Sequence, residues 1–187
     1  MTLTACSEYG LGIQGWAGRD TPDNRKITFA ASGSPRPKPS DGFFTSTWDA
    51  DRRSTPWLDF TRDGSPRSAD GRSLWLLEPD ADAGLYVIDS LEDFTLLAEA
   101  FPQRYDNPND PRFAPDWCQM LDGANDSLAA VHVTEAAIVD GQRQPGSGNP
   151  QFTGWDVEST LWLSPRYKVV GSAGPIDETW SLSPSSD

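Results

Sequence analysis

The sequence contains very little histidine, cysteine or lysine, and it has no long apolar run. It has one histidine, His132, and two widely separated cysteines, Cys6 and Cys118, so it lacks the ligand spacing of a zinc site. We therefore expect no metal. The simplest interpretation of the cysteines is reduced thiols in the cytoplasm. No stretch is long and apolar enough for a transmembrane or secretory segment, so we expect no membrane association.

Basic residues are outnumbered, because 15 Lys and Arg oppose 28 Asp and Glu, which gives a net charge of −13. Residues 1–77 carry a balance of +1, residues 78–126 carry −10, and the remainder carries −4. Nucleic-acid binding needs a basic surface, so we expect no nucleic-acid partner. The acidic middle segment supports a non-enzymatic alternative, an interaction module that mimics a polyanion and inhibits a basic protein.

Chain length and composition favour one sheet-based domain. A chain of 187 residues suits a single core, and 16 Gly with 16 Pro indicate long connections. Eight Trp and eight Phe supply the buried area. The sequence predicts a single α+β domain with a mostly antiparallel, split β-sheet core, a few short helices and long loops. We expect a poorly ordered or loop-rich segment over 1–26, the domain over 27–175 and a frayed tail over 176–187.

Hydrophobic periodicity locates the individual elements. Strands are expected over 26–31, 42–48, 74–77, 85–88, 128–133, 155–163 and 167–170. Helices are expected over 91–100, capped by Ser90, and around 116–121. The strands 74–77 and 85–88 are predicted to pair as a hairpin or near-hairpin. Loops are expected over 49–73, with room for a short helix, over 103–115 and over 140–153.

Hydroxyl side chains follow one another on the strand over 42–48. Thr45 and Thr47 share a face with Phe43, whereas Ser46 shares the other face with Trp48. Such residues are common strand formers, so they are either ordinary strand residues or the polar wall of a site.

Two carboxylates lie on one face of the strand over 155–163. Alternation places Asp156 and Glu158 side by side, roughly 7 Å apart at ~3.3 Å per residue. Burying such a pair without partners is costly, so it either faces water or has a function. His132 lies between two valines, where a histidine is more often a hydrogen-bonded core residue than a catalyst.

In this order, Thr45-Ser46-Thr47 and Asp156-Val157-Glu158 resemble two of the three signatures of the ADP-ribosyltransferase superfamily. In that family a Ser-Thr-Ser type strand supports the NAD pocket, and an acid-x-Glu strand supplies the catalytic Glu. The resemblance implies that NAD is the substrate and Glu158 the catalytic carboxylate, with Asp156 orienting or deprotonating the acceptor. It also implies that the hydroxyl strand holds the pocket and that Trp48 stacks on an aromatic ring.

The first signature of that family is an Arg or His on an early strand, and this sequence departs from it. The expected strand over 27–31 has neither residue. Arg25 lies just before it, and Arg36 lies just after it in a proline-alternating segment that is either a solvated loop or an anion-facing one. Either arginine could supply the cation.

The resemblance implies an NAD-dependent ADP-ribosyltransferase or NAD glycohydrolase that acts in the cytoplasm on an unidentified protein or small-molecule acceptor. If the activity is toxin-like, a cognate inhibitor protein is a further partner to test for. Two alternatives stay open: both motifs are ordinary strands of an unrelated fold, or the chain is the acidic interaction module.

Overall fold

The computed structural model describes residues 2–22, 27, 38–39, 42–64, 71–102, 114–123, 127–143 and 154–176. Within these ranges the strands are β1 (Thr4–Ala5), β2 (Gln14–Gly18), β3 (Phe43–Thr47), β4 (Arg72–Pro79), β5 (Gly84–Ile88), β6 (Ala130–Val133), β7 (Ser159–Trp162) and β8 (Tyr167–Ile176). The helices are α1 (Cys6–Tyr9), α2 (Pro56–Gly64), α3 (Leu91–Ala100), α4 (Trp117–Asp122) and α5 (Glu135–Arg143).

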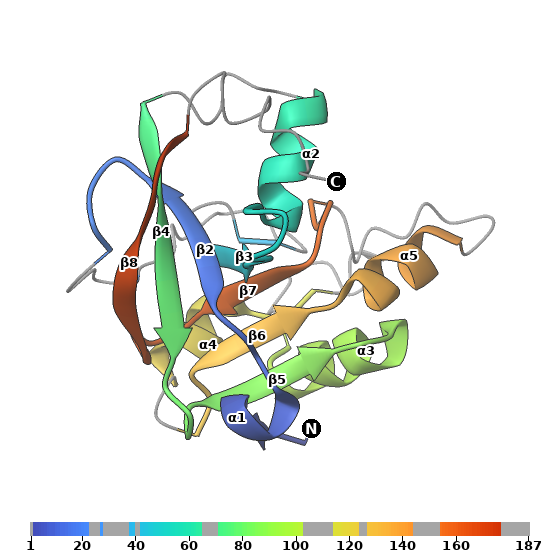
Figure 1. Ribbon diagram of the computed structural model, residues 1–187. Coiled ribbons are helices and arrows are strands. Elements are labelled where there is room, and N and C mark those ends of the chain that lie inside the picture. The colour runs from blue at the N-terminus through green and yellow to red at the C-terminus, as the bar shows by residue number, and fades with distance from the viewer. Residues whose placement is uncertain are drawn as a thin grey trace.

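The described strands form one open sheet in the order β1-β5-β6-β7-β3-β2-β4-β8 (Figure 1). Neighbouring strands are antiparallel except β5 and β6, which are parallel. Only the pairs Gln14 with Thr47 and Gly15 with Ser46 join β2 to β3, so the inner part of the sheet is held there by a short ladder. The predicted α+β fold with a mostly antiparallel sheet and short helices is confirmed.

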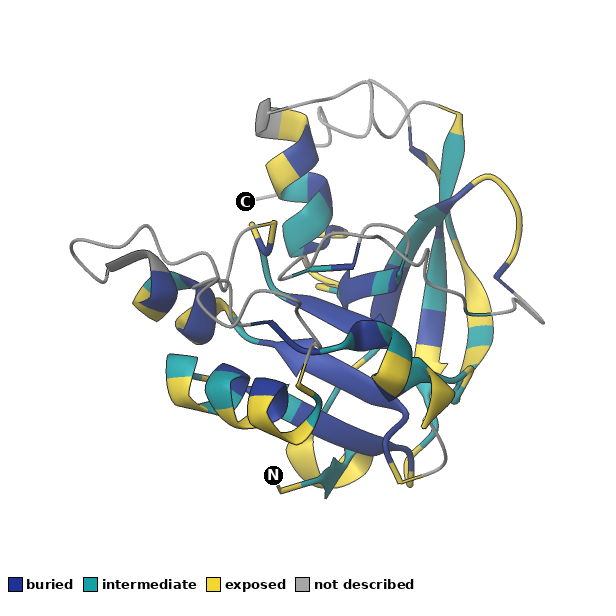
Figure 2. Cartoon of the chain, turned by 180° about the vertical axis from the view of Figure 1, so that it is seen from behind, coloured by how far each residue is buried: buried dark blue, intermediate teal, exposed yellow. Residues whose placement is uncertain are grey.

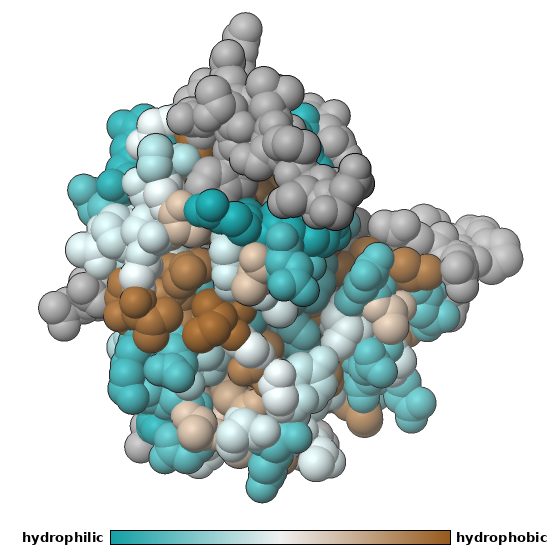
Figure 3. Space-filling view, viewed as in Figure 1, coloured by the Kyte–Doolittle hydropathy of each residue, from teal (hydrophilic) through white to brown (hydrophobic). Residues whose placement is uncertain are grey.

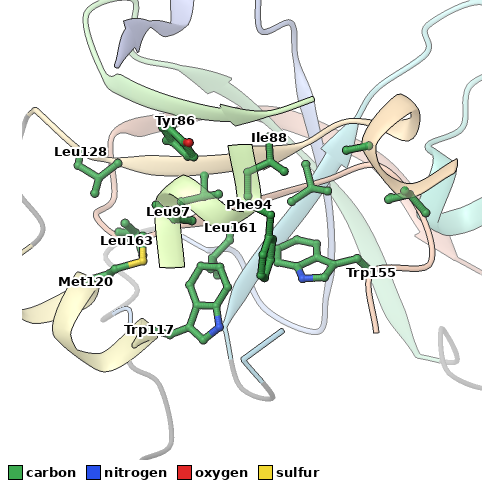
Figure 4. Close-up of a cluster of buried hydrophobic side chains, with 14 residues drawn as sticks. Tyr86, Ile88, Phe94, Leu97, Trp117, Met120, Leu128, Trp155, Leu161 and Leu163 are labelled. Carbon is green, nitrogen blue, oxygen red and sulfur yellow. The ribbon is translucent and has the colours of Figure 1, made fainter. Parts of the chain in front are cut away.

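An aromatic-rich core holds helices against one face of the sheet. Figure 2 shows α3 and α4 lying over the buried strands β5, β6 and β7. Figure 4 shows Trp155 pointing into the same cluster as Phe94 of α3 and Trp117 of α4. The two indoles lie 6.2 Å apart, and Trp155 is 1% exposed. A few large rings therefore supply much of this core.

Helix α3 confirms the helix predicted over 91–100. The hydroxyl of Ser90 accepts a hydrogen bond from the backbone N–H of Asp93 at 3.2 Å, as an N-cap does. Phe94 and Leu97 are fully buried, whereas Leu96 is exposed. The helix thus packs one side on the core, as its apolar spacing indicates.

The smallest of three core clusters of the described residues joins α2 to β4 and β8. Leu58 of α2 packs there with Leu74 and Ile176, and Trp48 lies against them. Figure 3 shows apolar surface over β8, β4 and β2, where Val170 is half exposed. No described helix is long and apolar enough to cross a membrane.

The expectation of a loop-rich segment over 1–26 is wrong for residues 2–22. This segment contains β1, α1 and β2, and β2 is an inner strand between β3 and β4. The sequence of β2 has two glycines and no apolar alternation, so this strand depends on pairing with strands that are remote in sequence.

The predicted hairpin of 74–77 with 85–88 is also wrong. β4 pairs with β2 and β8, whereas β5 pairs with β1 and β6. The acidic turn between them is held elsewhere, because Asp80 and Asp82 both accept hydrogen bonds from Arg166, at 2.9 and 2.7 Å. Because both edges of β4 and both edges of β5 are taken by other strands, the two cannot pair with each other.

Other boundaries differ by a few residues or more. β8 continues to Ile176, so the expected tail begins inside a strand, while residues 177–187 lie outside the described residues. α2 lies in the expected loop 49–73, and α5 was not predicted and extends into the expected loop 140–153. Of the strand expected over 26–31, only Ile27 is described.

Candidate functional site

The carboxylate of Glu158 is held by a single residue of the hydroxyl strand. Its Oε2 accepts from the backbone N–H of Thr47 at 3.0 Å, and its Oε1 accepts from the Thr47 hydroxyl at 2.9 Å. The Ser46 hydroxyl donates to the Glu158 carbonyl at 2.8 Å. The two predicted motifs, which are 111 residues apart at Thr47 and Glu158, therefore meet through direct hydrogen bonds.

These contacts also correct the predicted strand over 155–163. Only Ser159–Trp162 is a strand, and Asp156 and Glu158 precede it. Glu158 is outside β7 because its backbone and side chain bind β3 through Ser46 and Thr47 instead of extending the ladder. Asp156 is exposed, whereas the Glu158 side chain is only 12% exposed. The carboxylates thus occupy unlike environments rather than one shared face.

Behind Thr47 lies Gln14, whose buried side-chain amide has all its hydrogen-bonding positions filled. Its nitrogen donates to the Thr47 hydroxyl at 3.2 Å and to the Gly12 carbonyl at 3.3 Å. Its oxygen accepts from the hydroxyls of Thr45 at 2.9 Å and Thr160 at 3.0 Å. An amide offers two N–H donors and an oxygen with two lone pairs, so no position is left for a ligand.

The same hydrogen-bond directions assign the tautomer of His132. Because Thr160 gives its proton to Gln14, its oxygen must accept from His132 Nδ1, which is 2.9 Å away. His132 therefore carries its proton on Nδ1, and this atom also lies 3.4 Å from Oε1 of Glu158. The interpretation of His132 as a hydrogen-bonded core residue agrees with its 4% exposure.

Burial moves the pKa values of this pair in opposite directions. It lowers the pKa of His132 from 6.5 to about 4, although Asp89 acts the other way. Burial also raises the pKa of Glu158, which the two Thr47 hydrogen bonds lower and Glu135 raises further. At neutral pH the imidazole is uncharged, so the contact between the two side chains is no ion pair.

Glu158 and Thr47 line a cavity of about 520 Å³. Five carboxylate residues and one arginine contribute to its wall: Asp49, Asp59, Glu135, Asp156, Glu158 and Arg52. The arginine is already paired, since Arg52 lies 3.2 Å from Asp59. We call this space the acidic cavity, and it favours a cationic or neutral ligand group.

A second cavity, of about 210 Å³, lies beyond Thr55, which lines both spaces. Its described lining includes Lys38 and Arg72 and no Asp or Glu, and we call it the cationic cavity. Thr45 and Ser46 line it, whereas Thr47 lines the acidic cavity. The hydroxyl strand therefore contributes to both spaces.

The other predicted site residues do not join Glu158. Trp48 lines neither cavity and packs against the Leu74 cluster, while Arg25 and Arg36 lie outside the described residues. Sequence reasoning did not single out Gln14 as a site residue, because nothing local marks β2 as a strand. Lys38 lies two residues after Arg36 in the proline-alternating segment, and it was not singled out as a site residue either. Among the described residues, no three His, Cys, Asp or Glu side chains are grouped to bind a metal.

Compared with protein-family models, curated proteins and solved structures, the chain gives no match. The resemblance to the ADP-ribosyltransferase superfamily therefore stays a prediction that depends on the two motifs. The chemistry of the site follows from its own residues.

Replacing the central amide should destabilise the fold. Gln14→Leu leaves the hydroxyls of Thr45 and Thr160 without their acceptor, and each buried unsatisfied group costs about 1–3 kcal/mol. We expect the free energy of unfolding, measured by urea denaturation, to fall by about 3 kcal/mol. Gln119→Leu, at an exposed position of α4, should change the free energy of unfolding by less than about 0.5 kcal/mol. Equal effects of the two substitutions would refute the stabilising role of the Gln14 hydrogen bonds.

His132 is the only histidine of the chain, so its titration can be followed by NMR without overlap from other imidazoles. We expect the imidazole signals to titrate with a midpoint at about 4 and the ¹⁵N shifts to show a proton on Nδ1 at pH 7. The unfolded chain binds this proton near pH 6.5 and the native chain only near pH 4. The contribution of His132 to stability is therefore lost as the pH falls through that window. A midpoint above 6 or an Nε2 proton would contradict the assignment.

Proposed function

We propose that the chain cleaves NAD at the bond between ribose and nicotinamide and transfers ADP-ribose to an acceptor or to water. The observation that carries this proposal is the Glu158 carboxylate, which Thr47 fixes on the wall of the acidic cavity. This contact joins the hydroxyl motif to the acid-x-Glu motif that the resemblance implies.

The chemistry requires a fixed negative charge beside the ribose. The bond from C1′ to the ring nitrogen breaks, and its electron pair leaves with nicotinamide, which becomes neutral. Positive charge develops on the ribose, where the Glu158 carboxylate stabilises it. C1′ then bonds to water or to the acceptor nucleophile, and the nucleophile's proton passes to Asp156 or to solvent.

Charge complementarity supports this ligand. The nicotinamide ring of NAD is a pyridinium cation, and the acidic cavity has five carboxylate residues and one arginine that is already paired. A bound pyridinium next to Glu158 would be neutralised by cleavage, so the cavity would hold the product less tightly than the substrate.

The early strand differs from the signature that the resemblance implies. The strand beside the hydroxyl strand is β2, and its polar side chain there is Gln14, an uncharged and fully bonded amide. We assign Gln14 to positioning Thr47 rather than to binding NAD. A cation for the phosphates must then come from another element.

The acidic-module alternative receives less support from the placement of its carboxylates. In the middle segment, Asp80 and Asp82 bind Arg166, while Asp93 and Asp116 accept hydrogen bonds at helix N-termini. These carboxylates already have structural partners within the chain.

Cys6 and Cys118 are both free thiols, which supports the cytoplasm as the compartment of the proposed enzyme.

The first test is removal of the Glu158 charge. Glu158→Gln keeps the shape of the side chain but removes the negative charge, so we expect the rate of nicotinamide release from NAD to fall at least about 100-fold. Glu99→Gln, at an exposed position of α3, should leave the rate of nicotinamide release unchanged. Circular dichroism and thermal melting check the fold of both variants.

Three outcomes oppose the proposal. Turnover that survives in Glu158→Gln would remove the assigned role. If the native chain neither releases nicotinamide nor shows an NAD-dependent thermal shift, the enzyme proposal fails. Salt-sensitive capture of a basic protein without NAD turnover would instead favour the acidic module.

The second test uses the pH dependence of the reaction. Glu158 must be ionised, so turnover should fall as the pH drops through its raised pKa, which lies above 4.5. Thr47→Val removes a hydrogen bond that lowers this pKa, so the acidic limb of the pH–rate profile should move to higher pH. Thr95→Val, whose hydroxyl bonds only within α3, should leave the limb in place. A downward shift in Thr47→Val would be inconsistent with the role of Glu158.

A further inference from the structure

The cationic cavity contrasts in charge with the acidic cavity although the two are neighbours. Lys38 and Arg72 line the former without any described carboxylate, whereas five carboxylate residues line the latter. Thr55 lines both. Two adjoining spaces of opposite charge suit one ligand with a cationic end and an anionic part.

The ammonium of Lys38 lies in an unusual environment. Its Nζ is 4.6 Å from the centre of the Phe44 ring and 5.0 Å from that of Trp155. Burial lowers the pKa of Lys38, and the charge of Asp156 opposes this effect. Lys38 forms no salt bridge with any described residue. An anion in the cavity would therefore compensate a desolvated cation that two aromatic faces and the more distant charge of Asp156 now stabilise.

The cationic cavity is too small for a whole dinucleotide. Sites for drug-sized ligands usually measure about 300–1,000 Å³, and this cavity has about 210 Å³. Trp16 and Trp57 give it flat apolar walls. Gly15 lets Thr55 pack closely on β2 at the wall of this cavity, because an added Cβ would lie 2.6 Å from a methyl group of Thr55. Its size and its two cations fit the diphosphate of a nucleotide.

We propose that the cationic cavity binds the diphosphate of a nucleotide, with Lys38 and Arg72 as its cations. The inference rests on the proposed function in taking NAD as the complete ligand. The pyridinium end then occupies the acidic cavity beside Glu158, and the diphosphate lies on the other side of Thr55. Lys38 and Arg72 thereby supply the positive charge that the early strand lacks.

The test is calorimetric binding of ADP-ribose, which has the diphosphate but no nicotinamide, to the full chain. Lys38→Gln and Arg72→Gln should each raise the Kd at least about 10-fold, and each should weaken its dependence on salt. Lys38→Arg keeps the charge and should bind within about threefold of the native chain. Lys168→Gln, an exposed lysine on β8, should change the Kd by less than about twofold.

A second ligand separates the two cavities. Nicotinamide riboside carries the pyridinium and the ribose but no phosphate, so its affinity should not depend on Lys38 or Arg72. In NAD turnover, Lys38→Gln should raise KM and leave kcat nearly unchanged, because the interaction is made equally before and during bond cleavage.

The outcomes distinguish this inference from the enzymatic proposal. Binding of ADP-ribose that depends on Lys38 and Arg72 supports the diphosphate site even if NAD is never cleaved. The site is overturned if a folded variant that carries both Lys38→Gln and Arg72→Gln binds ADP-ribose with an unchanged Kd, or if the native chain does not bind ADP-ribose. Either result counts even if Glu158-dependent cleavage occurs. Equal losses for ADP-ribose and nicotinamide riboside also overturn it, because they would indicate a general structural effect.

Discussion

The side-chain amide of Gln14 is the constraint on which the rest of the site depends. Its two donors and its twice-accepting oxygen fix the proton direction of three threonine hydroxyls, on Thr45, Thr47 and Thr160. A reversed amide would place its oxygen against the Gly12 carbonyl oxygen, acceptor against acceptor, so only the observed orientation satisfies every partner. Because Gln14 is completely buried, water cannot replace a missing bond. The short β2–β3 ladder is therefore reinforced by a hydrogen-bonded network that accepts only one amide orientation.

From this amide two chains of hydrogen bonds lead to Glu158 and to His132. One passes through Thr47 to the carboxylate, and the other passes through Thr160 to the imidazole. Every link is uncharged until the carboxylate itself, so the buried network places one negative charge at the cavity wall. Positive charge is supplied from the opposite side, by Lys38 and Arg72. The site thus separates a neutral scaffold from charged groups that line the two cavities.

The sequence predicted those parts of the site that a few neighbouring residues determine by themselves. The hydroxyl run at Thr45–Thr47 and the carboxylate at Glu158 stand out from their neighbours, and helix α3 carries its own cap at Ser90. The rest depends on contacts between distant residues. β2 has no periodicity of its own, and the predicted hairpin fails because β4 and β5 each pair with two other strands. Glu158 lies outside the strand, where Thr47 binds it. A single sequence contains no local signal for such pairings.

The hydrogen bond between Gln14 and Thr160 spans 146 residues of the chain. During synthesis, β2 emerges long before β7, and its buried amide has only part of its final set of partners in the meantime. Closing so large a loop is entropically costly and comes late in folding. The network therefore cannot be complete before Thr160 has left the ribosome. The arrangement around Glu158 is therefore complete only after β7 has been synthesised.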